Sequence, residues 1–190
     1  MRSLLPLMLS TIACAPPEVV SADSGSPAVD GPVDGPTGGP GDDLVPVAGE
    51  VTLFINELMP ANSGAVDVDG DTPDWFELYN SGEVDVSLEG FTVTDDLDLP
   101  DQVRLDASLV VPAGGFLVLY ASGDEGVDHV SFQLSRAGEA VGLYFPDGSP
   151  ADRLTFGAVP DNLSLARSPD GGSDWQSTAS PTPGAANEID

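Results

Sequence analysis

The sequence predicts an all-β protein, built as an antiparallel sandwich or barrel. From Val51 onward, apolar residues recur with a period of two, as they do in strands that bury one face. Turn-forming residues separate these runs about every 8–12 residues, a spacing typical of antiparallel folds with many short strands. No stretch shows helical periodicity long enough to predict a helix.

Most of the expected strands have one apolar and one polar face. Within 74–79, Phe76 and Leu78 face one way, whereas Trp75, Glu77 and Tyr79 face the other. Later runs alternate in the same manner, at 84–88, 91–94, 103–106, 130–134, 141–145, 154–156 and 163–165. The run 116–120 is apolar throughout, which predicts a central strand covered on both faces.

The first residues resemble a bacterial lipoprotein signal peptide. Arg2 precedes an apolar run at 4–9, and Ala13 stands directly before Cys14, the only cysteine. Thr11 occupies a position where leucine is usual, and plain secretion or a misassigned start codon are the alternatives. The resemblance implies a signal peptide at 1–13. It also implies that lipidated Cys14 anchors the protein to a membrane of the bacterial cell envelope, facing the periplasm or the exterior.

The composition changes between the N-terminal part and the rest of the chain. Residues 14–49 are rich in Pro, Gly and Asp and contain no aromatic residue, so they cannot bury enough apolar surface to fold. This predicts a disordered linker at 14–49 and a folded β-sandwich domain at 50–187.

The charge of the chain restricts its partners. It has 32 acidic and 5 basic residues, a formal net charge of -27 at pH 7. Such a surface repels phosphate backbones, which excludes nucleic acid as an expected partner. Divalent cations, basic proteins and amine-rich polymers are favoured instead, although the charge could also serve only solubility.

An ordered series of segments carries a family resemblance. The segments lie at 55–62, 74–80 (DWFELYN), 88–96, 111–115, 132–135, 138–143 and 180–187 (SPTPGAAN). Taken in this order they resemble a bacterial lamin-tail domain, an immunoglobulin-like β-sandwich, over about 51–187. The resemblance implies a non-catalytic module for binding, adhesion or scaffolding, of a kind found on secreted and surface proteins.

The acidic loop before the 74–80 strand is a candidate calcium site. Asp67, Asp69 and Asp71 have the spacing at which alternate carboxylates converge on calcium, and Asp74 could complete the set. Leu78 stands where an EF-hand has its closing glutamate, so the loop is not an EF-hand. The alternative is a solvated Asp/Gly turn. A calcium site here would make the protein a calcium-dependent binding module for glycans or surface proteins. A second acidic cluster, at 95–101, could share or mimic the site.

The remaining candidates are aromatic residues and a histidine. Trp75 and Tyr79 either pack beneath the loops or form an exposed platform for a ligand. His129, the only histidine, is expected to be an ordinary loop residue. The sequence contains no Gly-x-Ser-x-Gly elbow, Walker loop or dinucleotide fingerprint, so we expect no enzyme.

Overall fold

The structure is a computed structural model that describes residues 52–189, and every regular element in this range is a strand. The predicted signal peptide, Cys14 and the linker lie outside the described residues. The strands are β1 (Leu53–Met59), β2 (Asp74–Asn80), β3 (Val86–Ser87), β4 (Thr92–Thr94), β5 (Val103–Arg104), β6 (Val110–Val111), β7 (Phe116–Ala121), β8 (Glu139–Tyr144), β9 (Pro150–Phe156), β10 (Ser164–Arg167) and β11 (Trp175–Thr178). The all-β prediction is confirmed.

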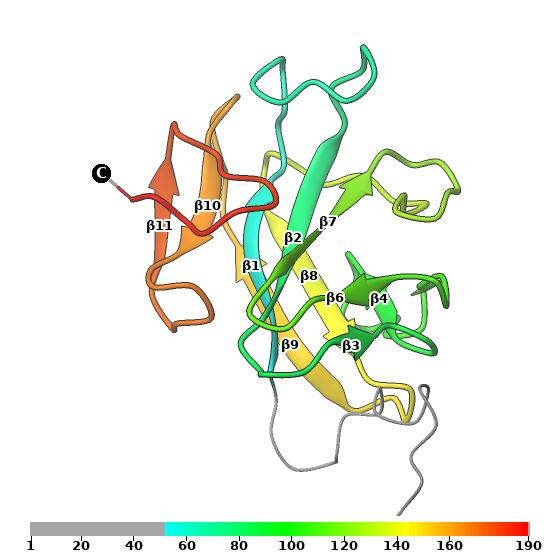
Figure 1. Cartoon of the computed structure of the whole chain (residues 1–190). Coiled ribbons are helices and arrows are strands. Elements are labelled where there is room, and N and C mark those ends of the chain that lie inside the picture. The colour runs from blue at the N-terminus through cyan, green and yellow to red at the C-terminus, as the bar shows by residue number, and fades with distance from the viewer. Residues whose placement is uncertain (1–51, 190) are drawn as a thin grey trace, which may run out of the picture. The chain divides into compact units, whose positions relative to one another are not determined.

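The strands form an antiparallel β-sandwich (Figure 1). One sheet has five strands in the order β11-β10-β1-β2-β7, and the facing sheet has four in the order β5-β4-β8-β9. A two-stranded ladder of β3 and β6 completes the set. Every paired strand is antiparallel to its neighbour. The longest ladders are β1 with β2, β2 with β7, and β8 with β9.

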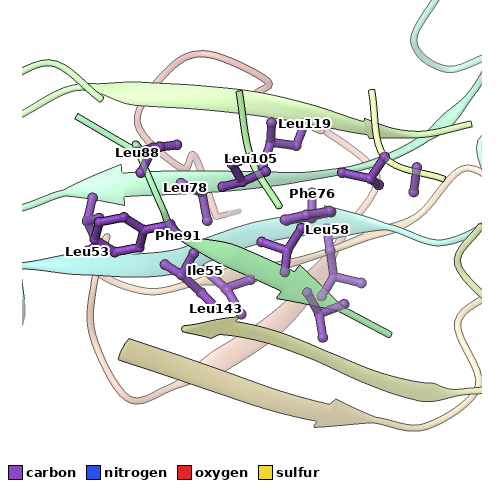
Figure 2. Close-up of a cluster of buried hydrophobic side chains, with 14 of the residues drawn as sticks. Leu53, Ile55, Leu58, Phe76, Leu78, Leu88, Phe91, Leu105, Leu119 and Leu143 are labelled. Carbon is purple, nitrogen blue, oxygen red and sulfur yellow. The ribbon is translucent and has the colours of Figure 1, made fainter. Parts of the chain in front are cut away.

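The hydrophobic core lies between the two sheets (Figure 2). Phe76 and Leu78 point into it from β2, which confirms the predicted face of that strand. Leu143 contributes from β8, and Phe91 lies just before β4. Full burial of each such side chain stabilises the fold by about 1.5–3 kcal/mol relative to exposure.

A β-bulge in β1 changes which residues face the core. The register with β2 shifts between Ile55 and Glu57, so Asn56 is the extra residue. Leu53 and Ile55 face the core before the bulge, and Leu58 faces it afterwards. The bulge therefore places Glu57 on the outer face of the five-stranded sheet.

Two expectations about individual strands are wrong. The apolar run 116–120 is β7, an edge strand rather than a central one, and the central strand of its sheet is β1. Isolated bridges from Tyr120 and Ser122 to the following loop cover only the C-terminal end of its free edge. The run 130–134 forms no strand, although its alternating apolar residues are buried as expected.

An ion pair joins the two sheets. Asp152 of β9 accepts a hydrogen bond at 2.8 Å from the guanidinium of Arg167 on β10. The same carboxylate accepts the backbone N–H of Ile55 at 2.9 Å. The guanidinium also lies over the ring of Trp175, with its central carbon 4.6 Å from the ring centroid. Trp175 therefore helps to hold the last strand, as a packed anchor would.

Candidate functional site

The acidic loop at 67–74 forms a tight turn. Val68 and Asp71 exchange backbone hydrogen bonds of 2.8 and 3.0 Å. Asp69 and Gly70, between them, both have positive φ, 55° and 95°. Two central residues of positive φ are typical of a type I′ turn, for which Asp-Gly is a favoured pair. The Asp/Gly turn considered as the alternative is therefore the conformation that the loop adopts.

The structure does not bring the four candidate calcium ligands together. The Asp67 side chain accepts the N–H of Gly70, whereas Asp74, the first residue of β2, accepts the N–H of Asn62 at the beginning of the loop, at 2.9 Å. Across residues 52–189, no group of three or more His, Cys, Asp or Glu residues could hold a metal ion. This includes the cluster at 95–101. Calcium binding stays a prediction without a preformed ligand cage to support it.

Trp75 is fully buried, so of the two alternatives it is a packed residue and does not form an exposed ligand platform. It lies on the outer face of β2, between Met59 of β1 and Tyr120 of β7, and chain segments outside the core cover that face. Its indole N–H has no hydrogen-bond partner within the described residues. Tyr79 is half-buried and stacks on Phe116, with ring centroids 4.9 Å apart. Both aromatic side chains are packed.

Exposed carboxylates gather on loops at one end of the sandwich, here called the acidic end. These are the β1–β2, β4–β5 and β7–β8 loops; the first and last are seen in Figure 1. Burial raises the pKa of Tyr120, and the charges of Asp128 and Asp69, from two of these loops, raise it further. The acidic end includes the exposed Asp67, Asp69, Asp71, Asp96, Asp98, Asp124 and Glu125, together with Asp128, whose side chain is half-exposed.

His129 lies on the β7–β8 loop within a small polar group. Its Nδ1 is 2.9 Å from Ser122 Oγ, and its Nε2 is 3.9 Å from an Asp128 oxygen. The N–H of Gly123, next to the serine, donates to the carbonyls of Val130 and Phe132 and is not free to stabilise an oxyanion. The group orders the loop and does not form a nucleophilic site.

Sequence analysis did not single out two buried carboxylates on the outer face of the five-stranded sheet. Glu57 of β1 pairs directly with Glu77 of β2, and both are fully buried. Figure 1 shows the C-terminal part of the chain passing over these two strands. Residues 180–187 form this cover, and we call them the closing segment.

The closing segment donates hydrogen bonds to both carboxylates. Thr182 donates its N–H and its hydroxyl to Glu57, each at 3.0 Å, and Gly184 donates its N–H to Glu77 at 2.6 Å. Ser164 of β10 adds a bond to Glu57 at 2.5 Å, and Asn56 a bond to Glu77 at 3.2 Å. These bonds fasten the end of the described chain to the centre of the sheet.

Burial dominates the electrostatics of this pair. Desolvation raises the pKa of Glu77 to about 8, despite the opposing bonds from Gly184 and Asn56. The pKa of Glu57 is also raised by burial, and bonds from Ser164 and Thr182 oppose the shift. Glu57 accepts more hydrogen bonds, so we assign the negative charge to Glu57 and the proton to Glu77 at neutral pH.

The comparison with known families agrees with this architecture. The model of the Lamin Tail Domain family matches residues 46–158. The chain belongs to the lamin tail domain family. A comparison with curated proteins gave no significant match. Strands β10 and β11 and the closing segment lie beyond the part that the family model matches, yet β10 pairs with β1 in the same sheet.

Three of the seven segments that suggested a lamin tail domain meet at the buried carboxylates. Glu57 lies in the 55–62 segment, Glu77 in DWFELYN, and Thr182 and Gly184 in SPTPGAAN. The sequence carried no signal of their burial, since a polar residue at an alternate position of a strand ordinarily faces water. The described residues include no helix long and apolar enough to cross a membrane.

Proposed function

We propose that this lamin tail domain protein is a non-catalytic module for binding, adhesion or scaffolding, held at a membrane surface by lipidated Cys14. The observation that supports the proposal is the acidic end, where exposed carboxylates from separate loops lie together on a rigid sandwich. Family membership favours the same role, because the lamin tail domain is an immunoglobulin-like fold without catalytic activity.

The charge of this surface favours a basic partner. The acidic end presents carboxylates from the β1–β2 and β7–β8 loops, and both loops lie close enough to influence the pKa of Tyr120. A basic protein or an amine-bearing glycan would find complementary charge there. Val127, which is 54% exposed on the β7–β8 loop, adds an apolar contact within the charged surface.

The experiment measures binding of the full chain to immobilised poly-L-lysine, at low and at physiological salt. One variant replaces the carboxylates of Asp67, Asp69, Asp71, Asp124, Glu125 and Asp128 with the corresponding amides. We expect it to bind at least about tenfold more weakly than the wild type, with a reduced salt dependence.

A matched control distinguishes the contribution of the acidic end to binding from that of the net charge of the protein. It carries the same number of amide substitutions elsewhere on the surface, at Glu83, Asp85, Glu89, Asp147, Asp174 and Glu188, all of which are exposed. If the control loses as much affinity as the first variant, the acidic end is not the binding surface and the proposal fails.

A further inference from the structure

Glu57 and Glu77 are close enough that their ionisations are coupled. They are directly paired across β1 and β2, and side chains in such positions have Cβ atoms about 4.5–5.5 Å apart. Both are inaccessible to solvent in the described structure. Two buried carboxyl groups in this arrangement do not both ionise at low cost, so the pair retains a proton above the ordinary range of glutamate.

The burial of the pair depends on the closing segment. Thr182 and Gly184 supply its backbone hydrogen bonds to the two carboxylates. Asn187 fastens the end of the segment by donating to the carbonyls of Asn56, at 3.2 Å, and Arg167, at 2.9 Å. Residues 180–187 include no charged side chain, so the segment covers the pair without neutralising it.

The other charged groups near the pair do not compensate its charge. Asp170, between β10 and β11, accepts hydrogen bonds from Asn56 and Asn187, and its charge raises the pKa of both glutamates further. The guanidinium of Arg167 donates to Asp152 and to the carbonyls of Ile55 and Gly172, and to neither glutamate. Ionisation of both glutamates under the closing segment is therefore disfavoured by the charge of Asp170 and by the lack of solvent.

We propose that the closing segment is a pH-controlled latch, which is closed while the Glu57–Glu77 pair holds a proton and opens as the pair loses it. When the segment lifts, water reaches both carboxylates and they ionise as ordinary glutamates do. The closed state thus holds a proton that the open state releases. Each unit of rising pH then shifts the equilibrium toward opening by up to about tenfold. This shift begins near the ordinary glutamate pKa of 4.5 and ends at about 8.

Amide hydrogen exchange between pH 5 and pH 8.5 tests the latch in the full chain. After correction for the intrinsic exchange rate, protection of the Thr182 and Gly184 amides is expected to fall severalfold to tenfold per pH unit. Amides of β2 in its ladder with β7, such as those of Phe76 and Leu78, report global unfolding. Because global unfolding releases the same proton, their protection is expected to fall with a similar slope but to stay well above that of the closing segment at every pH.

Two variants complete the test. Glu77→Gln removes the titrating group and is expected to flatten the pH profile of the closing segment. Glu139→Gln is the control, because Glu139 is a half-buried carboxyl of raised pKa that bonds to Ser135 and makes no bond to the segment. Protection that is independent of pH in the wild type overturns the proposal. So does protection of the β2 amides that is no higher than that of the closing segment, which would mean that both exchange only when the domain unfolds as a whole.

Discussion

Replacing Arg167 with methionine tests how the two sheets are held together. The Arg167 and Asp152 side chains are only 9% and 15% exposed and lie 2.8 Å apart. Methionine keeps part of the buried volume but leaves the Asp152 carboxylate without its counter-ion. Breaking a buried pair on one side typically costs 3–5 kcal/mol, since an uncompensated charge remains. We expect Arg167→Met to lower the free energy of unfolding by about 4 kcal/mol.

Urea denaturation at pH 7 measures this loss, and the chain offers a matched control. Arg136 and Asp161 form an exposed pair at 3.2 Å, with side chains 72% and 53% exposed. Arg136→Met is expected to cost less than about 1 kcal/mol. Adding Asp152→Asn to Arg167→Met should recover part of the loss, because the stranded charge is then gone. A loss below about 1 kcal/mol in Arg167→Met, equal to that of the control, would refute the reasoning.

Three further predictions concern pH, a turn and calcium. The folded chain holds a proton on Glu77 that the unfolded chain releases. The contribution of this proton to the free energy of unfolding is therefore fully present below pH 4.5. It is lost as pH rises toward about 8, by roughly 1.4 kcal/mol per pH unit. Urea midpoints that do not change over this range would contradict the prediction. Gly138→Ala should destabilise the domain in thermal melts by about 1–3 kcal/mol. Gly138 has a φ of +100°, and an added Cβ would lie 2.7 Å from the Phe156 carbonyl oxygen. Gly157→Ala is the control: a Cβ added there has no heavy atom within 4 Å, so its effect on stability should be near zero. Calcium at 100 times its dissociation constant should stabilise the protein by about 2.7 kcal/mol over the EDTA-treated protein if the 67–74 loop binds it, and equal melting temperatures would end that alternative.

The fold class was predictable because it depends on local periodicity. The alternation at 74–79 and in the later runs reports which face of each strand is buried, and the core confirms it for Phe76 and Leu78. The position of a strand within its sheet depends on non-local pairing, which periodicity does not encode. The run 116–120 shows this, since its apolar pattern is typical of a central strand but its pairing places it at the border of the sheet.

The buried carboxylates escaped prediction for a related reason. A polar residue at an alternate position of a strand is ordinarily expected to face water, and Glu57 and Glu77 both fit that expectation. What removes them from water is the closing segment, whose Thr182 lies 125 residues beyond Glu57. The bulge at Asn56 matters equally, because without the extra residue Glu57 would not face the same side as Glu77.

The segments that carry the family resemblance thus have a physical explanation that involves no ligand. Glu57, Glu77 and the closing segment depend on one another: the carboxylates need the donors of Thr182 and Gly184, and these bonds, with those of Asn187, fasten the segment to the sheet. Loss of either glutamate should therefore loosen the end of the described chain, while the core between the sheets stays packed. The acidic end shares none of these hydrogen bonds, so its exposed carboxylates can be replaced without disturbing the closing segment.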